Sequence, residues 1–408
     1  MSRKLSPTMT RPRLRALAAA LTCLTCAACG TTVSPPLPDA ATDARTTVPM
    51  DAPGDTPTDT PWDAPGDAPG DASGDMASAT DAMATAGHCV AFPGQPTATV
   101  TGGGTLTAVI ADAARLCAVG SVCFGADSRA CVQAYVQAQA GSVSVALLAR
   151  RGDLSGSLRA SGELSAALLY SARDCVSAAT DCAAVARCLG AGPVPAAMGP
   201  DDDSLCQGAR MLVRAHGRCG NDAVVPVDCG AQGLRCITAD VGLVWCGAQS
   251  CPSADTRPQC QTGPDYRECN GTAQVEGNCA ARPWLDTPSC WIDTDDNNVL
   301  CGSGQDCDHE YSLCAAGEVA EHCGFHSDAV PNYVRERTRC GAIAPGLHCG
   351  PMPGAPTLVG CLAGSACLPG TVTCAGTVAT ACAFGVPAAV DCAALGGTCS
   401  TNGCVGPR

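Results

Sequence analysis

VWCGAQSC at 244–251, VLCGSGQDC at 299–307 and VGCLAGSAC at 359–367 are three versions of one cysteine pattern. Each of them ends a unit that begins at an earlier cysteine, and the starting cysteines recur at similar intervals along the second half of the chain. They are Cys206, Cys260, Cys314 and, for a shorter last unit, Cys374. Recurrence at such a period is the sequence signature of an array of small repeated modules.

The cysteines within these units are numerous and regularly placed. They are Cys206, Cys219, Cys229, Cys236, Cys246 and Cys251; Cys260, Cys269, Cys279, Cys290, Cys301 and Cys307; Cys314, Cys323, Cys340, Cys349, Cys361 and Cys367; and finally Cys374, Cys382, Cys392, Cys399 and Cys404. The segments between them are short, contain β-branched residues and end at Gly, Pro, Asn or Asp, which favours short strands and turns. We therefore expect four cysteine-rich repeats with short β-strands or irregular structure, over 206–259, 260–313, 314–373 and 374–408.

Disulfides are the expected use of these cysteines. The chain has 33 Cys, only 3% aromatic residues, 46 Gly and 30 Pro in 408 residues, so its apolar core is modest and cross-links must compensate. Metal sites favour CxxC pairs, whereas the closest spacings after residue 29 are Cys246 to Cys251 and Cys399 to Cys404. Cysteine spacing does not determine the pairing. The five cysteines of the last unit and the seven between residues 88 and 205 are both odd numbers, which implies one bridge between these blocks or two unpaired thiols.

The block from 88 to 205 has a different pattern. Segments 106–119, 128–140 and 163–189 are rich in alanine, with apolar residues at helical spacing, and 142–160 is ambiguous between strand and helix. We predict a disulfide-linked α-helical domain here, so the overall fold class is a small, disulfide-rich, multi-module protein.

Local signals place the ends of these helices. Asp127 and Asp181 are expected N-caps, and Gly141 and Gly190 are expected to stop the helices they follow. Cys175 and Cys182 are seven residues apart, which would place them on one face of a continuous helix.

The first residues of the chain are typical of an export signal. Arg and Lys precede the apolar run LRALAAALTCLTCAA, and no acidic residue occurs before position 29. The run ends in CAAC at 26–29, followed by Gly30. This end resembles the lipobox of bacterial lipoproteins, which are cut by signal peptidase II before a cysteine that then carries the lipid.

The lipobox resemblance implies a signal peptide over 1–28 and lipidation of Cys29, including a palmitate-type acyl chain. In that family Asp after the cysteine retains the protein at the inner membrane, so Gly30 implies the cell outer membrane, with the protein facing the periplasm or the cell surface. Several acyl chains attach a protein stably to a membrane. We therefore expect the protein to contact the membrane through its N-terminal lipid.

Residues 29–87 are predicted to form a disordered tether. An Asp recurs every fourth residue from Asp51 to Asp75, among Ala, Pro, Gly and Thr. Proline and like charges four residues apart both oppose a helix, so an extended acidic spacer is expected. The net charge of −14 also argues against a nucleic-acid partner.

Candidate chemistry is sparse. The six histidines include His322 and His326, but Gly324 lies between them and the zinc-protease motif is absent. Asp293, Asp295 and Asn297 have the alternating oxygens of a weak calcium candidate, although the glycine and glutamate of a calcium loop are missing. The Trp and Tyr residues of the repeats could form either a binding surface or the small cores of the modules.

We therefore expect no cofactor and no catalytic residues, and a lipid-anchored cell-envelope protein that serves as a binding, adhesion or structural spacer module. Its ligand would be an envelope or extracellular protein or a glycan. Two alternatives stay open at this point: an exported hydrolase with its site in the helical block or between modules, and a protease inhibitor.

Overall fold

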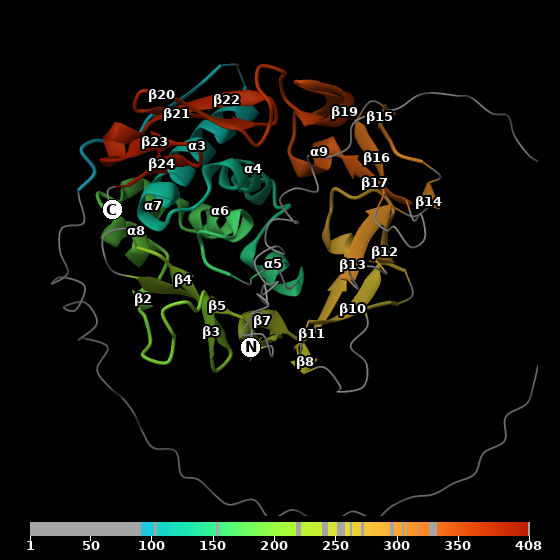
Figure 1. Cartoon of the computed structure of the whole chain (residues 1–408), viewed down its shortest axis with the longest axis horizontal. Coiled ribbons are helices and arrows are strands. Elements are labelled where there is room, and N and C mark those ends of the chain that lie inside the picture. The colour runs from blue at the N-terminus through green and yellow to red at the C-terminus, as the bar shows by residue number, and fades with distance from the viewer. Residues whose placement is uncertain are drawn as a thin grey trace, which may run out of the picture.

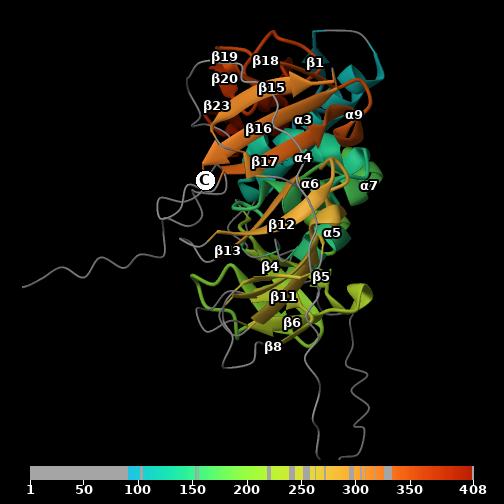
Figure 2. The same ribbon diagram turned by 90° about the vertical axis from the view of Figure 1, so that its right-hand side faces the viewer.

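The computed structural model describes residues 91–406 apart from 102–103, 152–153, 155, 218–221, 239–243, 251–257, 262, 271–272, 294–297, 304–305, 308, 317 and 326–332. Six helices form a hub, and four small β-modules follow an arc around it (Figure 1). In the view turned by 90°, the third and fourth modules lie toward one end of the hub and the first and second toward the other (Figure 2). The modules are numbered 1 to 4 in chain order. Buried side chains from the hub and from modules 1, 3 and 4 form one continuous apolar core.

The hub contains α3 (Thr105–Phe124), α4 (Ser128–Gln139), α5 (Val145–Arg151), α6 (Gly162–Ser171), α7 (Arg173–Ala178) and α8 (Cys182–Cys188). The side chain of Asp127 accepts a hydrogen bond from the backbone N–H of Arg129, and that of Asp181 accepts one from Ala184, which confirms both expected N-caps. Gly141 and Gly190 follow α4 and α8 in the left-handed conformation, as expected for helix stops.

The helix expected over 163–189 is three helices, and this part of the prediction is wrong. The chain leaves α7 at Ala179 in an extended conformation and starts again at the Asp181 cap. Cys175 and Cys182 therefore lie on different helices. Cys175 pairs with Cys188, whereas Cys182 pairs with Cys123 of α3.

Helix α3 is the centre of the hub. It is long and apolar enough to cross a membrane by length and composition, but most of it is buried within the protein. Disulfides join it to α4 through Cys117–Cys131 and to α8 through Cys123–Cys182. Helices α4 and α6 approach closely at Gly162, where an added Cβ would lie 2.4 Å from the Cβ of Ala130.

Each module has the same order of elements: three antiparallel strands, one short helical turn and a two-stranded hairpin. Module 1 contains β3 (Ser204–Gln207), β4 (Arg210–Ala215), β5 (Ala223–Asp228), η3 (Gly230–Gln232), β6 (Arg235–Thr238) and β7 (Val244–Gly247). Module 2 contains β9 (Gln259–Cys260), β10 (Asp265–Asn270), β11 (Ala273–Asn278), η4 (Cys279–Ala281), β12 (Pro288–Asp293) and β13 (Asn298–Ser303).

Module 3 contains β15 (Tyr311–Ala315), β16 (Val319–Phe325), β17 (Tyr333–Arg339), α9 (Cys340–Ile343), β18 (His348–Met352) and β19 (Ala355–Leu362). Module 4 contains β20 (Val372–Ala375), β21 (Val378–Ala383), β22 (Val386–Asp391), η5 (Cys392–Leu395), β23 (Thr398–Ser400) and β24 (Gly403–Val405). An N-terminal helical block followed by short antiparallel sheets rich in disulfides confirms the predicted fold class.

Two disulfides recur in every module. One joins the first strand to the first hairpin strand: Cys206–Cys236, Cys260–Cys290, Cys314–Cys349 and Cys374–Cys399. The other joins the helical turn to the second hairpin strand: Cys229–Cys246, Cys279–Cys301, Cys340–Cys361 and Cys392–Cys404. The two hairpin cysteines lie directly opposite each other on paired strands. Each hairpin is thus fixed to its own sheet through both strands.

The helical turn of the module begins at a sequence feature that recurs in three of the four copies. Asp228, Asn278 and Asp391 immediately precede the turn cysteine, and each side-chain oxygen accepts a backbone N–H two or three residues further on. In module 3 the same position is Arg339, which provides no such cap.

Two further disulfides connect modules. Cys307 pairs with Cys323 and Cys367 pairs with Cys382, so the connection out of one module is bound to the middle strand of the next. The fifth cysteine of the last unit is accounted for by the second of these bridges. Cys89, Cys219 and Cys251 lie outside the described residues.

Each module also has a fourth strand, which pairs with its third strand. In modules 1 to 3 this strand comes from the connection just before the module: β2 (Gly192–Pro193), β8 (Gln249–Ser250) and β14 (Asp306–Cys307). In module 4 it is β1 (Ala98–Val100), from the other end of the described chain, which pairs with β22. The N-terminal segment therefore completes the C-terminal module.

Polar contacts also hold the modules to the hub. The side chain of Arg214 in β4 is 4% exposed and forms an ion pair with Asp222 at 2.7 Å. It also donates hydrogen bonds to the carbonyl oxygens of Asp202 and Gly199. Its own carbonyl accepts the N–H of Leu158 from the hub at 3.1 Å. This arginine thus binds the segment that enters module 1 and connects β4 to the hub.

Candidate functional site

The strongest candidate site is a groove between the segment that leads into β1 and the exposed side of α3, with Ser177 of α7 at one end. It is a shallow depression that is widely open to solvent, with a volume of about 730 Å³. The lining residues are Gln95, Pro96, Thr97, Ala98, Ala108, Ala111, Asp112, Arg115 and Ser177. We refer to this feature as the groove.

A hydrogen-bond network forms the polar end of the groove. The guanidinium of Arg115 donates from Nη2 to Asp112 Oδ1 at 2.6 Å and to Ser177 Oγ at 2.9 Å. The hydroxyl of Tyr135 donates to the other carboxylate oxygen of Asp112 at 2.8 Å. The side chains of Asp112 and Arg115 are 26% and 27% exposed, so both are fixed by partners and still reach solvent.

Tyr135 supports this network from the core. Its ring is fully buried and stands at 86° to the ring of Tyr170, with centroids 5.5 Å apart. Burial, together with the hydrogen bond to Asp112, raises the pKa of Tyr135 far above its usual value. The phenol is therefore a permanent hydrogen-bond donor to Asp112 and is unsuited to proton transfer near neutral pH.

Covalent links hold the walls of the groove in place. Helix α3 is bridged on both sides, as described above, and α7 is tied to α8 by Cys175–Cys188. On the other wall, the N–H of Phe92 donates to the carbonyl of Thr180, and that of Gly94 donates to Ala394. The groove is thus preformed, because its walls belong to elements that are fixed independently of a ligand.

His322 is part of a second polar arrangement, in module 3. Ser312, His322 and Glu336 lie opposite one another on β15, β16 and β17. The hydroxyl of Ser312 accepts the N–H of Val359 at 2.8 Å and lies 2.9 Å from His322 Nδ1. Either the hydroxyl or the ring nitrogen is the donor in this hydrogen bond, according to the tautomer of His322. Burial lowers the pKa of His322, an effect that the nearby Glu336 opposes.

A row of Ser, His and Glu suggests a hydrolytic triad, but its hydrogen bonds indicate a structural role. A nucleophilic serine needs separate backbone donors for the oxyanion of its substrate. Here the donor beside the hydroxyl, the N–H of Val359, is used by Ser312 itself. The arrangement joins the sheet of module 3 to its hairpin. His326, the other member of the predicted histidine pair, lies outside the described residues.

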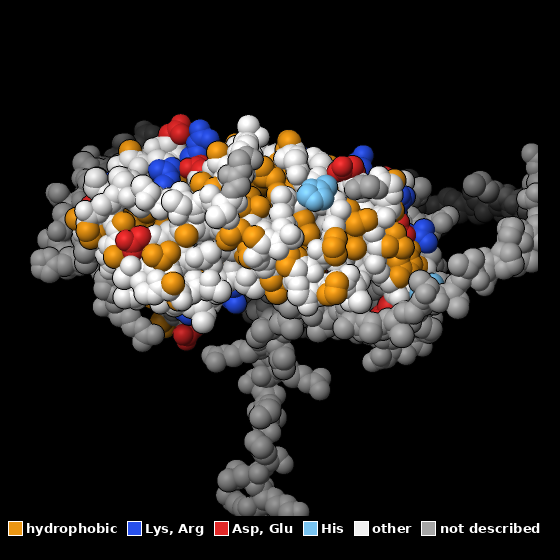
Figure 3. Space-filling view, turned by 90° about the horizontal axis from the view of Figure 1, so that it is seen from above, with side chains coloured by type: hydrophobic (Ala, Val, Ile, Leu, Met, Phe, Trp, Pro, Cys, Tyr) orange, Lys and Arg blue, Asp and Glu red, His pale blue; other side chains and the backbone are white. Residues whose placement is uncertain are grey.

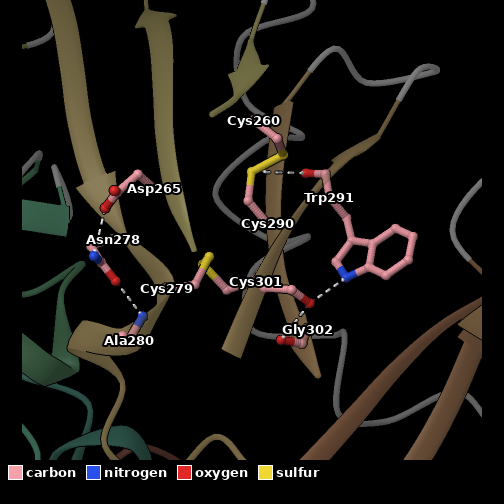
Figure 4. Close-up of a disulfide and its surroundings, with 10 residues drawn as sticks. Cys260, Asp265, Asn278, Cys279, Ala280, Cys290, Trp291, Cys301 and Gly302 are labelled. Carbon is pink, nitrogen blue, oxygen red and sulfur yellow. Dashed lines mark hydrogen bonds between the residues drawn. A yellow bond between two sulfur atoms is a disulfide. The ribbon is translucent and has the colours of Figure 1, made fainter. Parts of the chain in front are cut away.

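In module 2, Trp291 lies beside the Cys260–Cys290 and Cys279–Cys301 bridges (Figure 4). The indole N–H of Trp291 donates to Ser289 Oγ at 3.0 Å. A Cβ added at Gly302 on the paired strand would lie 3.1 Å from Cδ1 of this ring and 2.6 Å from Val334 of module 3, so both side chains pack against the glycine. Tyr266 lies directly over Gly277 on the paired strand, where an added Cβ would be 2.2 Å from the ring, so this aromatic side chain needs a glycine beneath it.

The remaining predicted site residues are located as follows. Asp293 ends β12, whereas Asp295 and Asn297 of the weak calcium candidate lie outside the described residues, as does Cys29. Within the described part of the chain, no group of three or more His, Cys, Asp or Glu side chains is placed to hold a metal ion.

The surface of module 4 and its neighbours carries little charge. Residues 341–406 contain one acidic residue, Asp391, and no Lys or Arg. Seen from above, hydrophobic and uncharged groups cover the middle of this face, and charged side chains are few (Figure 3). Residues 82–111, which lead into the groove, have no charged side chain.

No family model, curated protein or solved structure compared with this chain matches it.

Proposed function

We propose that this protein is an exported binding protein of the cell envelope, attached to the outer membrane by lipid on Cys29 and displaying the disulfide-bonded fold on an acidic tether. The observation that carries the binding role is the groove, an open depression whose polar groups are fixed by the hub. The numerous disulfides indicate an oxidising, extracytoplasmic location.

The proposed anchor rests on the N-terminal sequence. CAAC at 26–29 follows a basic segment and an apolar run, and the Asp-rich spacer begins shortly afterwards. Such a spacer would keep the folded part away from a lipid surface. The anchor and the groove thus have complementary roles, attachment at one end and recognition at the other.

The chemistry of the groove favours binding over hydrolysis. Asp112 is held by Tyr135 and Arg115, and Arg115 is held by Ser177, so each ionisable group is committed to a partner. General acid–base catalysis needs a group that changes its protonation near the working pH. The pKa of Tyr135 is raised far above that range. Fixed donors and acceptors are instead what orientation of a bound ligand requires.

The anchor is tested by metabolic labelling with radioactive palmitate, in the wild type and in Cys29→Ser. We expect label in the wild-type protein, no label in the variant, and release of the variant from the membrane fraction. Persistent label, or persistent membrane attachment of Cys29→Ser, would overturn the proposed anchor.

The binding role is tested by capture from native envelope extract, with the oxidised full-length protein as bait. Ala108→Leu fills the groove from the exposed side of α3, and Ala140→Leu is the matched control, at an exposed helix end outside the groove. We expect material that is retained by the wild type and by Ala140→Leu but lost with Ala108→Leu. Equal retention by all three proteins would contradict a binding role for the groove.

A further inference from the structure

We infer that the groove binds a neutral, polyhydroxylated ligand, that is, an uncharged carbohydrate chain. This inference rests on the proposed binding function and adds the ligand class to it. It follows from three properties of the lining: its charge balance, its hydrogen-bonding groups and its small apolar surface.

The charge balance disfavours recognition of a ligand by ion pairing. Asp112 and Arg115 neutralise each other at 2.6 Å, and they are the only charged residues among those that line the groove. A strongly anionic ligand would have to compete with Asp112 for the guanidinium, and a cationic ligand would have to compete with Arg115 for the carboxylate. Because each competition breaks an existing charged hydrogen bond, a ligand without net charge is favoured.

The hydrogen-bonding groups of the groove suit hydroxyl groups, which donate and accept at the same time. Both hydrogen bonds that Arg115 donates among the described residues leave from Nη2, so Nε and Nη1 are the donors that can serve a ligand. The carboxylate oxygens of Asp112 each accept one described bond and have lone pairs left over. Gln95 and Thr97, both exposed, add an amide and a hydroxyl on the opposite wall. Vicinal hydroxyls of a sugar can bridge such alternating donors and acceptors.

The apolar part of the lining is built from small side chains. Ala98, Ala108 and Ala111 present methyl groups without bulk, so that a ligand can approach both backbones closely. A sugar ring has C–H groups on its faces and hydroxyls at its edge. It would place its face on the alanine surface of α3 and its edge toward Asp112 and Arg115.

The rigidity of the walls adds to affinity for such a ligand. Each sugar hydroxyl exchanges hydrogen bonds with water for hydrogen bonds with protein, so the net gain per bond is only about 1 kcal/mol. Weak bonds of this kind give useful affinity when the protein has nothing to order on binding. The bridges of α3 and α7 provide this condition.

The test is titration calorimetry on the oxidised full-length protein, in a detergent without a sugar headgroup, so that the detergent does not occupy the groove. The probes are tetrasaccharides of glucose, mannose and N-acetylglucosamine, with tetragalacturonate as an anionic probe of equal length and an acidic and a basic peptide. We expect binding of at least one neutral tetrasaccharide and at least about tenfold weaker binding of tetragalacturonate and the peptides.

Three variants locate the binding. Ala108→Leu and Arg115→Met should each lower the affinity for the neutral tetrasaccharide by about tenfold or more, whereas Ala140→Leu should bind it like the wild type. Thermal unfolding of each variant verifies that it is folded. Asp112→Asn is the second polar variant should Arg115→Met unfold.

Binding of tetragalacturonate or a peptide in preference to all neutral probes, binding of no neutral probe, or binding that Ala108→Leu leaves intact would each overturn the carbohydrate assignment. Failure of the proposed binding function would give a different result. The capture experiment would then show no difference between the wild type and Ala108→Leu, whatever the chemistry of the ligand.

Discussion

Removal of the buried bridge of module 1, by Cys229→Ala together with Cys246→Ala, should destabilise that module by about 3 kcal/mol. The two cysteines are 0% and 1% exposed, and their bridge closes a loop of sequence separation 17. The chain-entropy relation for a loop of this length gives about 3 kcal/mol at room temperature. The bond fixes the helical turn η3 to strand β7, so its loss should act first on the β6–β7 hairpin.

The measurement is hydrogen exchange followed by mass spectrometry, because a large chain with many bridges need not unfold in a two-state manner. A loss of about 3 kcal/mol corresponds to exchange about 100-fold faster for amides that exchange through opening of the module. The matched control is Cys175→Ala with Cys188→Ala, whose separation of 13 predicts a similar loss in the hub.

The control should accelerate exchange in α7 and α8 and leave β6 and β7 protected. Unchanged protection of β6 and β7 in the Cys229/Cys246 variant would refute the reasoning, since it would mean that the hairpin is held without this bond. Equal acceleration in both regions by both variants would also refute it, because the bridges would then not act locally.

Three further predictions concern single side chains. Gly162→Ala forces α4 and α6 apart and should cost about 1–3 kcal/mol, measured as a lower unfolding temperature. The control Gly341→Ala has nothing within 4 Å of its new Cβ and should be neutral, so equal effects of the two substitutions would contradict the close packing at Gly162. Arg214→Met should cost about 3 kcal/mol in urea unfolding because it removes an ion pair and two hydrogen bonds made by a nearly buried guanidinium. Asp222→Asn should cost less because Asp222 is 39% exposed, and the reverse order would be inconsistent with this account. Burial lowers the pKa of His322, so on acidification the unfolded chain, with a histidine pKa of about 6.5, takes up the proton before the folded protein does. The contribution of His322 to stability is therefore complete above pH 6.5 and falls below it. Unfolding temperatures measured from pH 7.5 to 5 should decline more for the wild type than for His322→Gln, and parallel curves would contradict this prediction.

Short-range features of the fold could be predicted because their cause lies within a few residues. The caps at Asp127 and Asp181 are examples, since each side chain bonds a backbone N–H two or three positions away. The repeated modules were also predictable, because each copy repeats the same short strands, turns and cysteine positions. The short β-branched segments and the turn residues between cysteines were enough to predict these features without knowledge of the disulfide pairing.

Features that depend on distant partners could not be predicted in this way. Cys175 and Cys182 have the spacing of one helix face, yet the chain breaks at 179–181 and they bond to Cys188 and Cys123. The sequence did contain a signal for the break, since an N-cap at Asp181 indicates that a new helix starts there. The helical periodicity across 163–189 was given more weight than this local signal.

The groove was also outside the reach of sequence reasoning. Asp112 and Arg115 are three residues apart on α3, which is the spacing of an ordinary surface ion pair. Ser177 reaches Arg115 only because α7 folds back against α3, and the wall at 95–98 has no periodic pattern. The absence of charge from 82 to 111, directly before an isolated Asp and Arg, was the one signal available.

The position of β1 changes how the repeats should be regarded. In a linear array each repeat contacts its neighbours alone, and repeats can be removed from an end with a proportionate loss of stability. Here Ala98 and Val100 pack into the core beside β22, and Thr99 pairs with Ala389, so the end of the array is completed by the chain that precedes the hub. Removing module 4 would therefore expose the core face of β1 and loosen the wall of the groove that β1 continues. It follows that the four modules, the hub and the groove form a single closed unit, and that the predicted tether enters this unit at the strand on which the closure depends.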